Sequence, residues 1–169
     1  MKQDTMFPSD LIAAVSGLID ILRRKRLMLA TAESCTGGLI AGLITSVSGS
    51  SDVLDCGFVT YSNTAKMRMI GVPAALISNH GAVSEEVARA MAEGAIAHSA
   101  ADVAVAVTGV AGPGGGTATK PVGLVHCAAA RKRHTTLHRE LRLGDIGREE
   151  VRLETVRAAV AMAYEIAGP

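Results

Sequence analysis

A serine and a cysteine stand side by side at a point where an apolar stretch gives way to two glycines. In the run "AESCTGG", Ser34 and Cys35 are both potential nucleophiles, and Gly37 and Gly38 follow shortly after. If a helix opens near Thr36, the glycine amides are among its unpaired N-terminal donors, which can bind a phosphate or stabilise an oxyanion. The alternative is structural, with Ser34 or Thr36 only capping the helix.

The two candidate nucleophiles are expected to face opposite ways. Adjacent side chains on an extended strand point to opposite sides, so only one of the pair can face a site. A helix N-terminus lowers the pKa of a thiol, which makes Cys35 a rival nucleophile. Buried free cysteine is common, however, so we predict that Cys35 packs inward and Ser34 faces the site. Glu33, the carboxylate of this segment, either positions a substrate amine or braces the turn.

A second polar segment, "TYSNTAK", supplies Tyr61, Asn63 and Lys66. A lysine in a partly desolvated cleft can lose its proton and act as a base toward a serine, and a tyrosine hydroxyl can relay that proton. The alternative makes Lys66 a solvated helix charge and Tyr61 a half-buried strand residue.

The third segment, "TGVAGPGGGTATKP", combines glycine amides with the hydroxyls of Thr108 and Thr117. Successive amides of this kind form an anion cradle, and the glycines concerned are Gly112, Gly114, Gly115 and Gly116. No G-K-[ST] ends the loop and a strand follows it, so it is neither a Walker loop nor a dinucleotide fingerprint. A flexible hairpin-like connection is the alternative. Arg148 is either a further anion ligand or a surface charge.

Other catalytic chemistries find little support in the sequence. Neither G-x-S-x-G nor S-x-x-K occurs, and none of the five histidines lies in a glycine-rich segment, which disfavours a Ser-His-Asp triad. No cluster has the spacing of metal ligands. We therefore expect no metal and no cofactor.

Helices alternate with strands along most of the chain. The patterns predict helices over residues 9–26, 36–47, 63–73, 83–99 and 148–167, and strands over residues 27–33, 56–62, 102–110, 122–130 and 134–143. This order predicts an α/β fold, a three-layer α/β/α sandwich with a mostly parallel mixed sheet and one antiparallel pair. Each polar segment follows a strand, and ligands collect at the carboxyl ends of strands in open α/β sheets.

Composition limits the function classes further. The 169 residues fit one domain (1–169), and the near balance of 17 Lys and Arg against 16 Asp and Glu, with 2% aromatics, gives no support for nucleic-acid binding. No apolar stretch reaches the roughly 20 residues of a membrane helix, and no secretory signal opens the chain. Three cysteines without metal spacing indicate reduced thiols in a cytoplasmic protein. Ala- and Met-rich helix faces favour a homodimer.

Four motifs together resemble the C-terminal domain of the CinA-type competence/damage-inducible proteins, a family that includes stand-alone nicotinamide-nucleotide amidases. They are "TAESCTGGLIAGLIT", "GSSDVLDCGFVTYSNTAK", "GVPAALISNHGAVSEEVARAMAEGA" and "AVTGVAGPGGGTATKPVGLV", and the resemblance runs from about Leu27 to the C-terminus. It implies a three-layer α/β/α enzyme without metal that hydrolyses the carboxamide of nicotinamide mononucleotide to nicotinic acid mononucleotide and ammonia.

By motif position, the resemblance implies that Ser34 is the nucleophile and that Lys66 and Tyr61 handle its proton. We expect the amides near Gly37 and Gly38 to hold the oxyanion, and the loop 112–117, with Arg148, to hold the nucleotide phosphate.

The chain departs from the family pattern in two places. Only about 26 residues precede the first strand, so we expect no activity of the nucleotide-binding or pyrophosphatase domain that precedes it in many members. The chain also reads "GDIGR" where the family has "GDR", which puts the phosphate role of Arg148 in question. A non-catalytic nucleotide-binding or regulatory module, or an amidase for another amide, are the competing functions.

Overall fold

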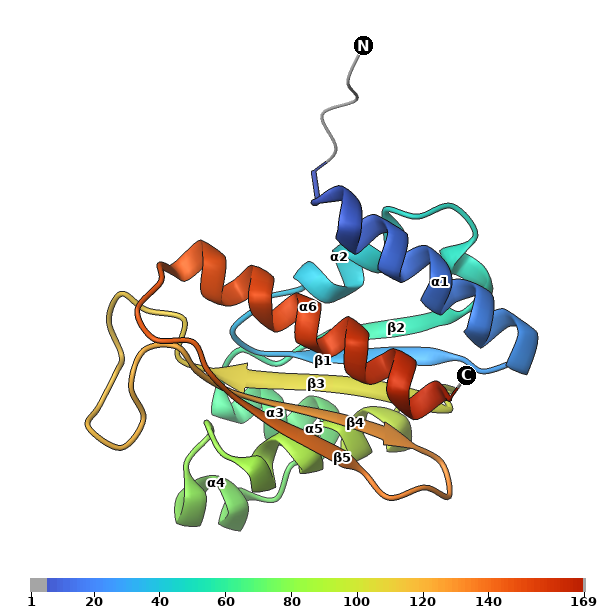
Figure 1. Ribbon diagram of the computed structural model, residues 1–169. Coiled ribbons are helices and arrows are strands. Elements are labelled where there is room, and N and C mark those ends of the chain that lie inside the picture. The colour runs from blue at the N-terminus through green and yellow to red at the C-terminus, as the bar shows by residue number, and fades with distance from the viewer. Residues whose placement is uncertain (1–5, 169) are drawn as a thin grey trace.

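The computed structural model describes residues 6–168, which form a five-stranded sheet with helices on both faces (Figure 1). The strands are β1 (Leu29–Glu33), β2 (Leu54–Val59), β3 (Val103–Gly109), β4 (Leu124–Arg131) and β5 (Leu137–Arg142). The helices are α1 (Ser9–Lys25), α2 (Leu39–Thr45), α3 (Asn63–Ile70), α4 (Ala74–His80), α5 (Glu85–Ala97) and α6 (Arg148–Ala167), with a 3₁₀ turn, η1 (Ser50–Asp52).

The strands lie in the order β2-β1-β3-β4-β5, and β1 is parallel to both of its neighbours. β4 runs antiparallel to β3 and also to β5, so the sheet has two antiparallel pairs where the sequence predicted one. The reason is the connection between β3 and β4, which is a glycine-rich loop and not a crossover helix. The predicted mostly parallel mixed sheet is otherwise confirmed, since four of the five strands point the same way.

Two apolar layers flank the sheet, and they are built from different residues. The face toward α1, α2 and α6 carries the larger side chains of β3, Val103, Val105 and Val107. The opposite face carries Ala104 and Ala106, which pack against the buried side of α5. Alternation along the strand sends these two sets to opposite faces. The prediction of a three-layer α/β/α sandwich is therefore confirmed (Figure 1).

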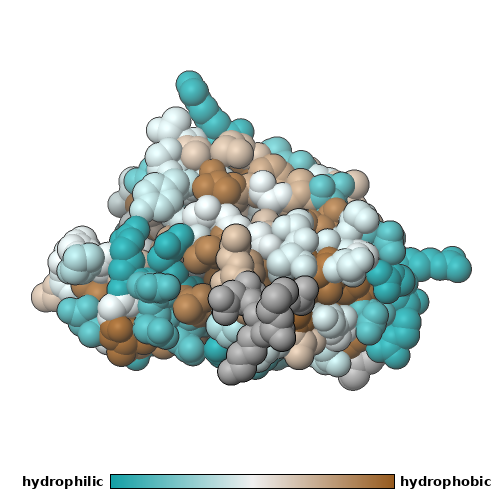
Figure 2. All heavy atoms as spheres, turned by 90° about the horizontal axis from the view of Figure 1, so that it is seen from above, coloured by the Kyte–Doolittle hydropathy of each residue, from teal (hydrophilic) through white to brown (hydrophobic). Residues whose placement is uncertain are grey.

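The outer surface over α1 and α6 mixes hydrophobic with hydrophilic side chains (Figure 2). Within residues 6–168, no helix has both the length and the apolar character that crossing a membrane requires.

Three strand ends meet at one edge of the sheet. Glu33, the last residue of β1, pairs with Val59 of β2 and with Val107 of β3. The three polar segments leave the sheet from these neighbouring ends, which confirms the expectation that they lie together. The helix predicted over 36–47 begins only at Leu39, because Gly37 and Gly38 have φ of 60° and 104° and form a turn.

Residues 63–73 are predicted to contain a short helix that Gly71 and Pro73 stop, and the structure confirms this helix and its end. It is α3, which ends where Gly71 adopts a left-handed conformation, and Pro73 then opens α4, a helix that the sequence analysis missed. α3 packs closely on α5, because a Cβ placed on Gly94 of α5 would lie 2.0 Å from the carbonyl oxygen of Ile70. This close approach fixes the helix that carries Lys66.

Replacing Gly94 with Ala is expected to destabilise the protein by about 1–3 kcal/mol, because the added methyl group overpacks the α3–α5 contact. A matched control is Gly17→Ala in α1, where the nearest heavy atom to the new Cβ is 3.8 Å away. That change should give the usual gain of about 0.5–1 kcal/mol. Urea denaturation measures both, and equal effects of the two substitutions would contradict the close contact.

Candidate active site

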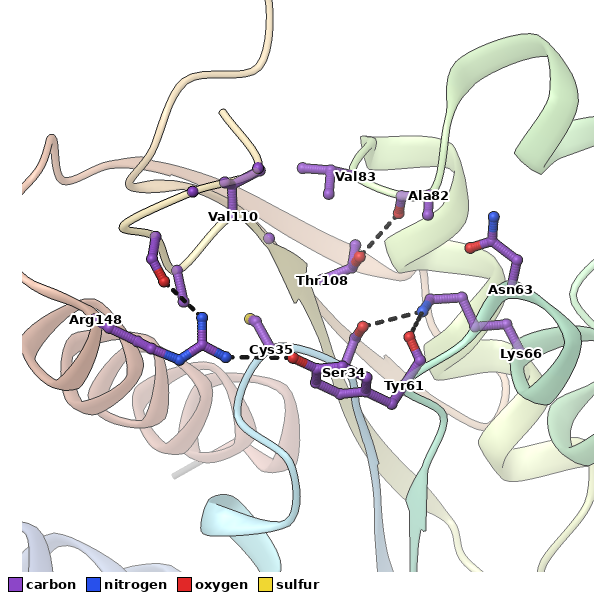
Figure 3. A pocket seen from close by; sticks show the side chains of 15 residues that line it. Ser34, Cys35, Tyr61, Asn63, Lys66, Ala82, Val83, Thr108, Val110 and Arg148 are labelled. Carbon is purple, nitrogen blue, oxygen red and sulfur yellow. Dashed lines mark hydrogen bonds between the residues drawn. The ribbon is translucent and has the colours of Figure 1, made fainter. Parts of the chain in front are cut away.

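The hydroxyl of Ser34 and the amine of Lys66 meet at the carboxyl end of β1. Ser34 follows β1 directly, and Lys66 lies in α3, whose first turn is capped by the hydroxyl of Ser62. The Lys66 Nζ atom is 3.0 Å from Ser34 Oγ (Figure 3). It also donates to the carbonyl oxygens of Thr60 at 2.8 Å and Tyr61 at 3.4 Å. A serine and a lysine 32 residues apart thus share a hydrogen bond.

Burial favours the neutral form of the Lys66 amine. The residue is 1% exposed, and this burial lowers the pKa of the amine below its usual value. None of its three partners is a carboxylate. A neutral amine donates two hydrogens, here to the two carbonyls, and its lone pair then accepts the proton of the Ser34 hydroxyl. The arrangement therefore suits a base that activates a serine.

The residues after Ser34 form a turn that Glu33 holds from within. We call residues 34–38 the nucleophile turn. The Glu33 carboxylate is fully buried and accepts hydrogen bonds from the Thr36 hydroxyl at 2.7 Å and from the amides of Ile40 and Ala41 at 2.8 and 3.0 Å. Of the two roles considered for Glu33, the structure supports bracing the turn. The Thr36 hydroxyl is likewise used inside the turn.

The two glycines of the turn shape it without lining the cleft. The amide of Gly37 donates to the carbonyl of Ser34 at 3.1 Å, so it is already used within the turn. Gly38 is the N-cap of α2. The Gly37 amide is therefore not free to hold an oxyanion, whereas the same role for the Gly38 amide stays a prediction.

Cys35 packs against the core, as strand alternation predicts, and its other side lines part of the cleft around Ser34. Its side chain is 6% exposed and belongs to the apolar cluster on the α1 and α6 face. Burial raises the pKa of the Cys35 thiol to about 11. The thiol is therefore protonated at neutral pH and a poor nucleophile, which leaves Ser34 as the candidate.

A cleft of about 300 Å³ opens above Ser34. Of the predicted residues, those that line it are Ser34, Tyr61, Asn63, Lys66, Thr108, Gly112, Gly114, Gly115 and Arg148. Those that lie outside the lining are Glu33, Thr36, Gly37, Gly38, Gly116 and Thr117. Sequence reasoning missed Ala82 and Val83, which carry no chemical signal of their own. The Thr108 hydroxyl donates to the Ala82 carbonyl at 2.8 Å and so holds this wall in place (Figure 3).

Arg148 reaches the cleft despite the two additional residues before it. It is the first residue of α6, and its guanidinium donates to the Gly112 carbonyl at 2.6 Å and to the Tyr61 hydroxyl at 3.2 Å (Figure 3). The structure therefore places the Tyr61 hydroxyl against Arg148, while the Tyr61 carbonyl faces Lys66. This separates Tyr61 from the proton-handling role that it was expected to share.

The other end of the glycine loop is held by hydrogen bonds within the loop and to the end of α4. Thr117 donates its amide to the Lys120 carbonyl at 2.8 Å, and its hydroxyl accepts from the Lys120 amide at 3.0 Å. The Lys120 amine donates to the carbonyl of His80. Thr117 thus shapes the loop from outside the cleft, and Lys120 is a loop anchor that the sequence analysis did not identify.

The cleft has the charge of an anion site. Arg148 is its cationic lining residue, since burial favours the neutral form of Lys66, and no Asp or Glu is among the lining residues. Within residues 6–168, the amides of Gly114 and Gly115 and the side-chain amide of Asn63 have no protein hydrogen-bond partner. Unpaired N–H groups beside a guanidinium bind carboxylates and phosphates. In the same part of the chain, no group of three His, Cys, Asp or Glu is arranged to hold a metal ion.

The profile of the CinA C-terminal domain matches residues 13–167. The chain belongs to this family. The competence/damage inducible protein CihA from Agrobacterium tumefaciens is 53% identical, with a TM-score of 0.92 over 94% of this chain and 96% of that one. A competence-damaged protein (CinA) superfamily protein from Escherichia coli is 34% identical, with a TM-score of 0.86 over 94% and 92% of the two chains.

Curated relatives in the CinA family are longer than this chain. A CinA-like protein of Syntrophus aciditrophicus is 49% identical over 143 residues, which are 84% of this chain and 34% of the relative. One from Akkermansia muciniphila is 60% identical over 109 residues, which are 64% and 26%. The chain thus spans about a quarter to a third of the length of these relatives.

Replacing Glu33 with Gln is expected to lower the free energy of unfolding by about 2 kcal/mol or more. The new NH₂ group replaces one of the two oxygens, so either the Ile40 amide, which meets Oε1, or the Ala41 amide, which meets Oε2, loses its acceptor. Glu150→Gln, at an exposed position on α6, is the control and should change stability little. Chemical denaturation measures both variants, and a Glu33→Gln protein as stable as the control would contradict the bracing role.

Proposed function

We propose that this CinA-family domain hydrolyses the carboxamide of nicotinamide mononucleotide to nicotinic acid mononucleotide and ammonia. The observation that carries the proposal is the 3.0 Å contact between Ser34 Oγ and the buried Lys66 amine. A base of lowered pKa touching a serine hydroxyl, at the floor of a cationic cleft, is the arrangement of a serine amidase. The nicotinamide nucleotide follows from the resemblance to family amidases, since the relatives' names state no substrate.

In the proposed acylation step, the neutral Lys66 amine takes the proton of the Ser34 hydroxyl as Oγ bonds to the carboxamide carbon. The tetrahedral intermediate then collapses with cleavage of the C–N bond. The Lys66 ammonium returns the proton to the leaving nitrogen, which departs as ammonia. Ser34 is left as an ester of the pyridine carboxylic acid.

In the deacylation step, the Lys66 amine takes a proton from water as the water oxygen attacks the ester carbon. The C–O bond to Ser34 breaks, the acid is released, and Lys66 returns the proton to Oγ. The Lys66 amine lies 3.0 Å from Ser34 Oγ, so its ammonium form can return the proton as negative charge develops on the leaving Oγ.

The proposed phosphate site lies across the cleft from Lys66. Arg148 provides the charge, and the free amides of Gly114 and Gly115 provide hydrogen-bond donors. Asn63 lines the side nearer Lys66. This distribution supports a phosphorylated amide over free nicotinamide.

We also propose a cytoplasmic location, which the three free cysteines support, and the expected homodimer stays a prediction.

Ser34→Ala is expected to lower kcat for ammonia release from nicotinamide mononucleotide by about 10³-fold or more, because the covalent route is lost. Cys35→Ala is the matched neighbour and should keep most of the activity. Ammonia is measured by a coupled assay and product by mass spectrometry. Full activity of Ser34→Ala would refute the serine mechanism, and a wild-type protein that binds the nucleotide without turnover would favour a binding module.

The pH dependence of kcat/KM is expected to rise with pH through the pKa of Lys66, since only the neutral amine accepts the serine proton. Because burial lowers this pKa, kcat/KM should rise at a pH below the usual pKa of lysine. Lys66→Arg should be inactive across the range, since a guanidinium stays protonated. A pH-independent rate, or an active arginine variant, would contradict Lys66 as the base.

A further inference from the structure

A second arginine of α6 contacts the nucleophile turn from behind. Arg152 follows Arg148 by one helical turn and therefore lies on the same face of α6. Its Nε donates to the carbonyl of Cys35 at 3.2 Å, and its NH2 group donates to the carbonyl of Thr36 at 3.1 Å. One guanidinium thus binds two consecutive peptide carbonyls of the turn that begins with Ser34.

The turn is held by opposite charges on its two sides. The buried Glu33 carboxylate accepts from its donors, among them the Thr36 hydroxyl. Arg152, on the other side, donates to carbonyls of the turn. Within residues 6–168, Arg152 is the sole hydrogen-bond partner of the Cys35 carbonyl, whereas the Thr36 carbonyl also accepts from the Leu39 amide. Removing Arg152 therefore leaves one carbonyl of the turn without a protein partner.

Arg152 lies outside the cleft that contains Ser34 and lines a neighbouring hollow, which it shares with Arg148. Arg148 lines both. Arg152 is half-buried, and its guanidinium points to backbone atoms of the turn. The planar guanidinium suits two neighbouring acceptors, which a lysine ammonium serves less well.

We propose that Arg152 is a positioning residue that clamps the nucleophile turn and so fixes the Ser34 hydroxyl against Lys66. Together with Arg148, it makes one face of α6 the common support of the turn, the Tyr61 segment and the glycine loop. Its effect on turnover rests on the proposed function. The clamp itself does not depend on that function, so the two are tested separately.

The first experiment compares Arg152→Met with Arg152→Lys and with Arg157→Met. Arg157 is a half-buried arginine of the same helix that pairs with Asp10 and Glu154, and it serves as the matched control. Loss of the clamp should lower kcat about 10- to 100-fold with KM for the nucleotide nearly unchanged, because a displaced nucleophile loses its attack geometry. Arg152→Lys should recover part of kcat, and the control should behave as wild type.

The second experiment needs no turnover and uses the thiol next to Ser34. Cys35 is buried and its carbonyl is held by Arg152, so opening of the turn should expose it. Alkylation by iodoacetamide, followed at the Cys35 peptide by mass spectrometry, should be at least about tenfold faster in folded Arg152→Met than in Arg157→Met.

The outcomes of the two experiments are distinguishable. Equal Cys35 alkylation in Arg152→Met and Arg157→Met, with both variants folded by circular dichroism, would overturn the clamp whether or not the protein is an amidase. Faster alkylation in Arg152→Met would support the clamp even if wild type released no ammonia, a result that would count against the proposed function alone. A rise in KM without a fall in kcat would also overturn the proposal, because it would make Arg152 a binding residue.

Discussion

Moving a charged amine out of water is unfavourable, and the surrounding contacts nevertheless hold the Lys66 amine in a buried position. Its charged form loses hydration without gaining a carboxylate, so the neutral form is favoured. Two carbonyls at the end of β2, those of Thr60 and Tyr61, accept from it, and Ser34 provides its remaining contact. The capped start of α3 and its close packing on Gly94 fix the helix that carries this amine.

Each layer of the fold contributes a different part of the site. The sheet positions Ser34 at the end of β1, the helix layer with α5 carries Lys66 on α3, and the opposite layer supplies the arginines of α6. The charges next to the turn are paired with backbone groups. The Glu33 carboxylate accepts from backbone amides, and Arg152 donates to backbone carbonyls. The cleft itself keeps positive charge and free amides, which suits an anionic ligand.

Strand patterns predicted that the segments of Ser34 and Lys66 meet at one edge of the sheet, and alternation placed Cys35 in the core. The pairing of the two side chains was predicted by the family resemblance. Sequence patterns misplaced the start of α2, since its capping carboxylate comes from the preceding strand and not from a local cap residue. Arg152 was missed because its sequence position on the charged start of the helix looks the same as that of an arginine exposed to solvent. The second antiparallel pair depends on β4 lying between β3 and β5 in the sheet. This is a long-range arrangement that local periodicity does not predict.

The protonation state of Lys66 is the property on which the proposed chemistry depends, and it can be measured without any substrate. The chain has five lysines, so a protein labelled with ¹⁵N at the lysine amines gives a spectrum that a Lys66→Met variant assigns. Titrating the ¹⁵Nζ resonance gives the pKa of each amine. We predict that Lys66 titrates well below the other four. A Lys66 amine that titrates with the exposed lysines would contradict its role as the base for Ser34.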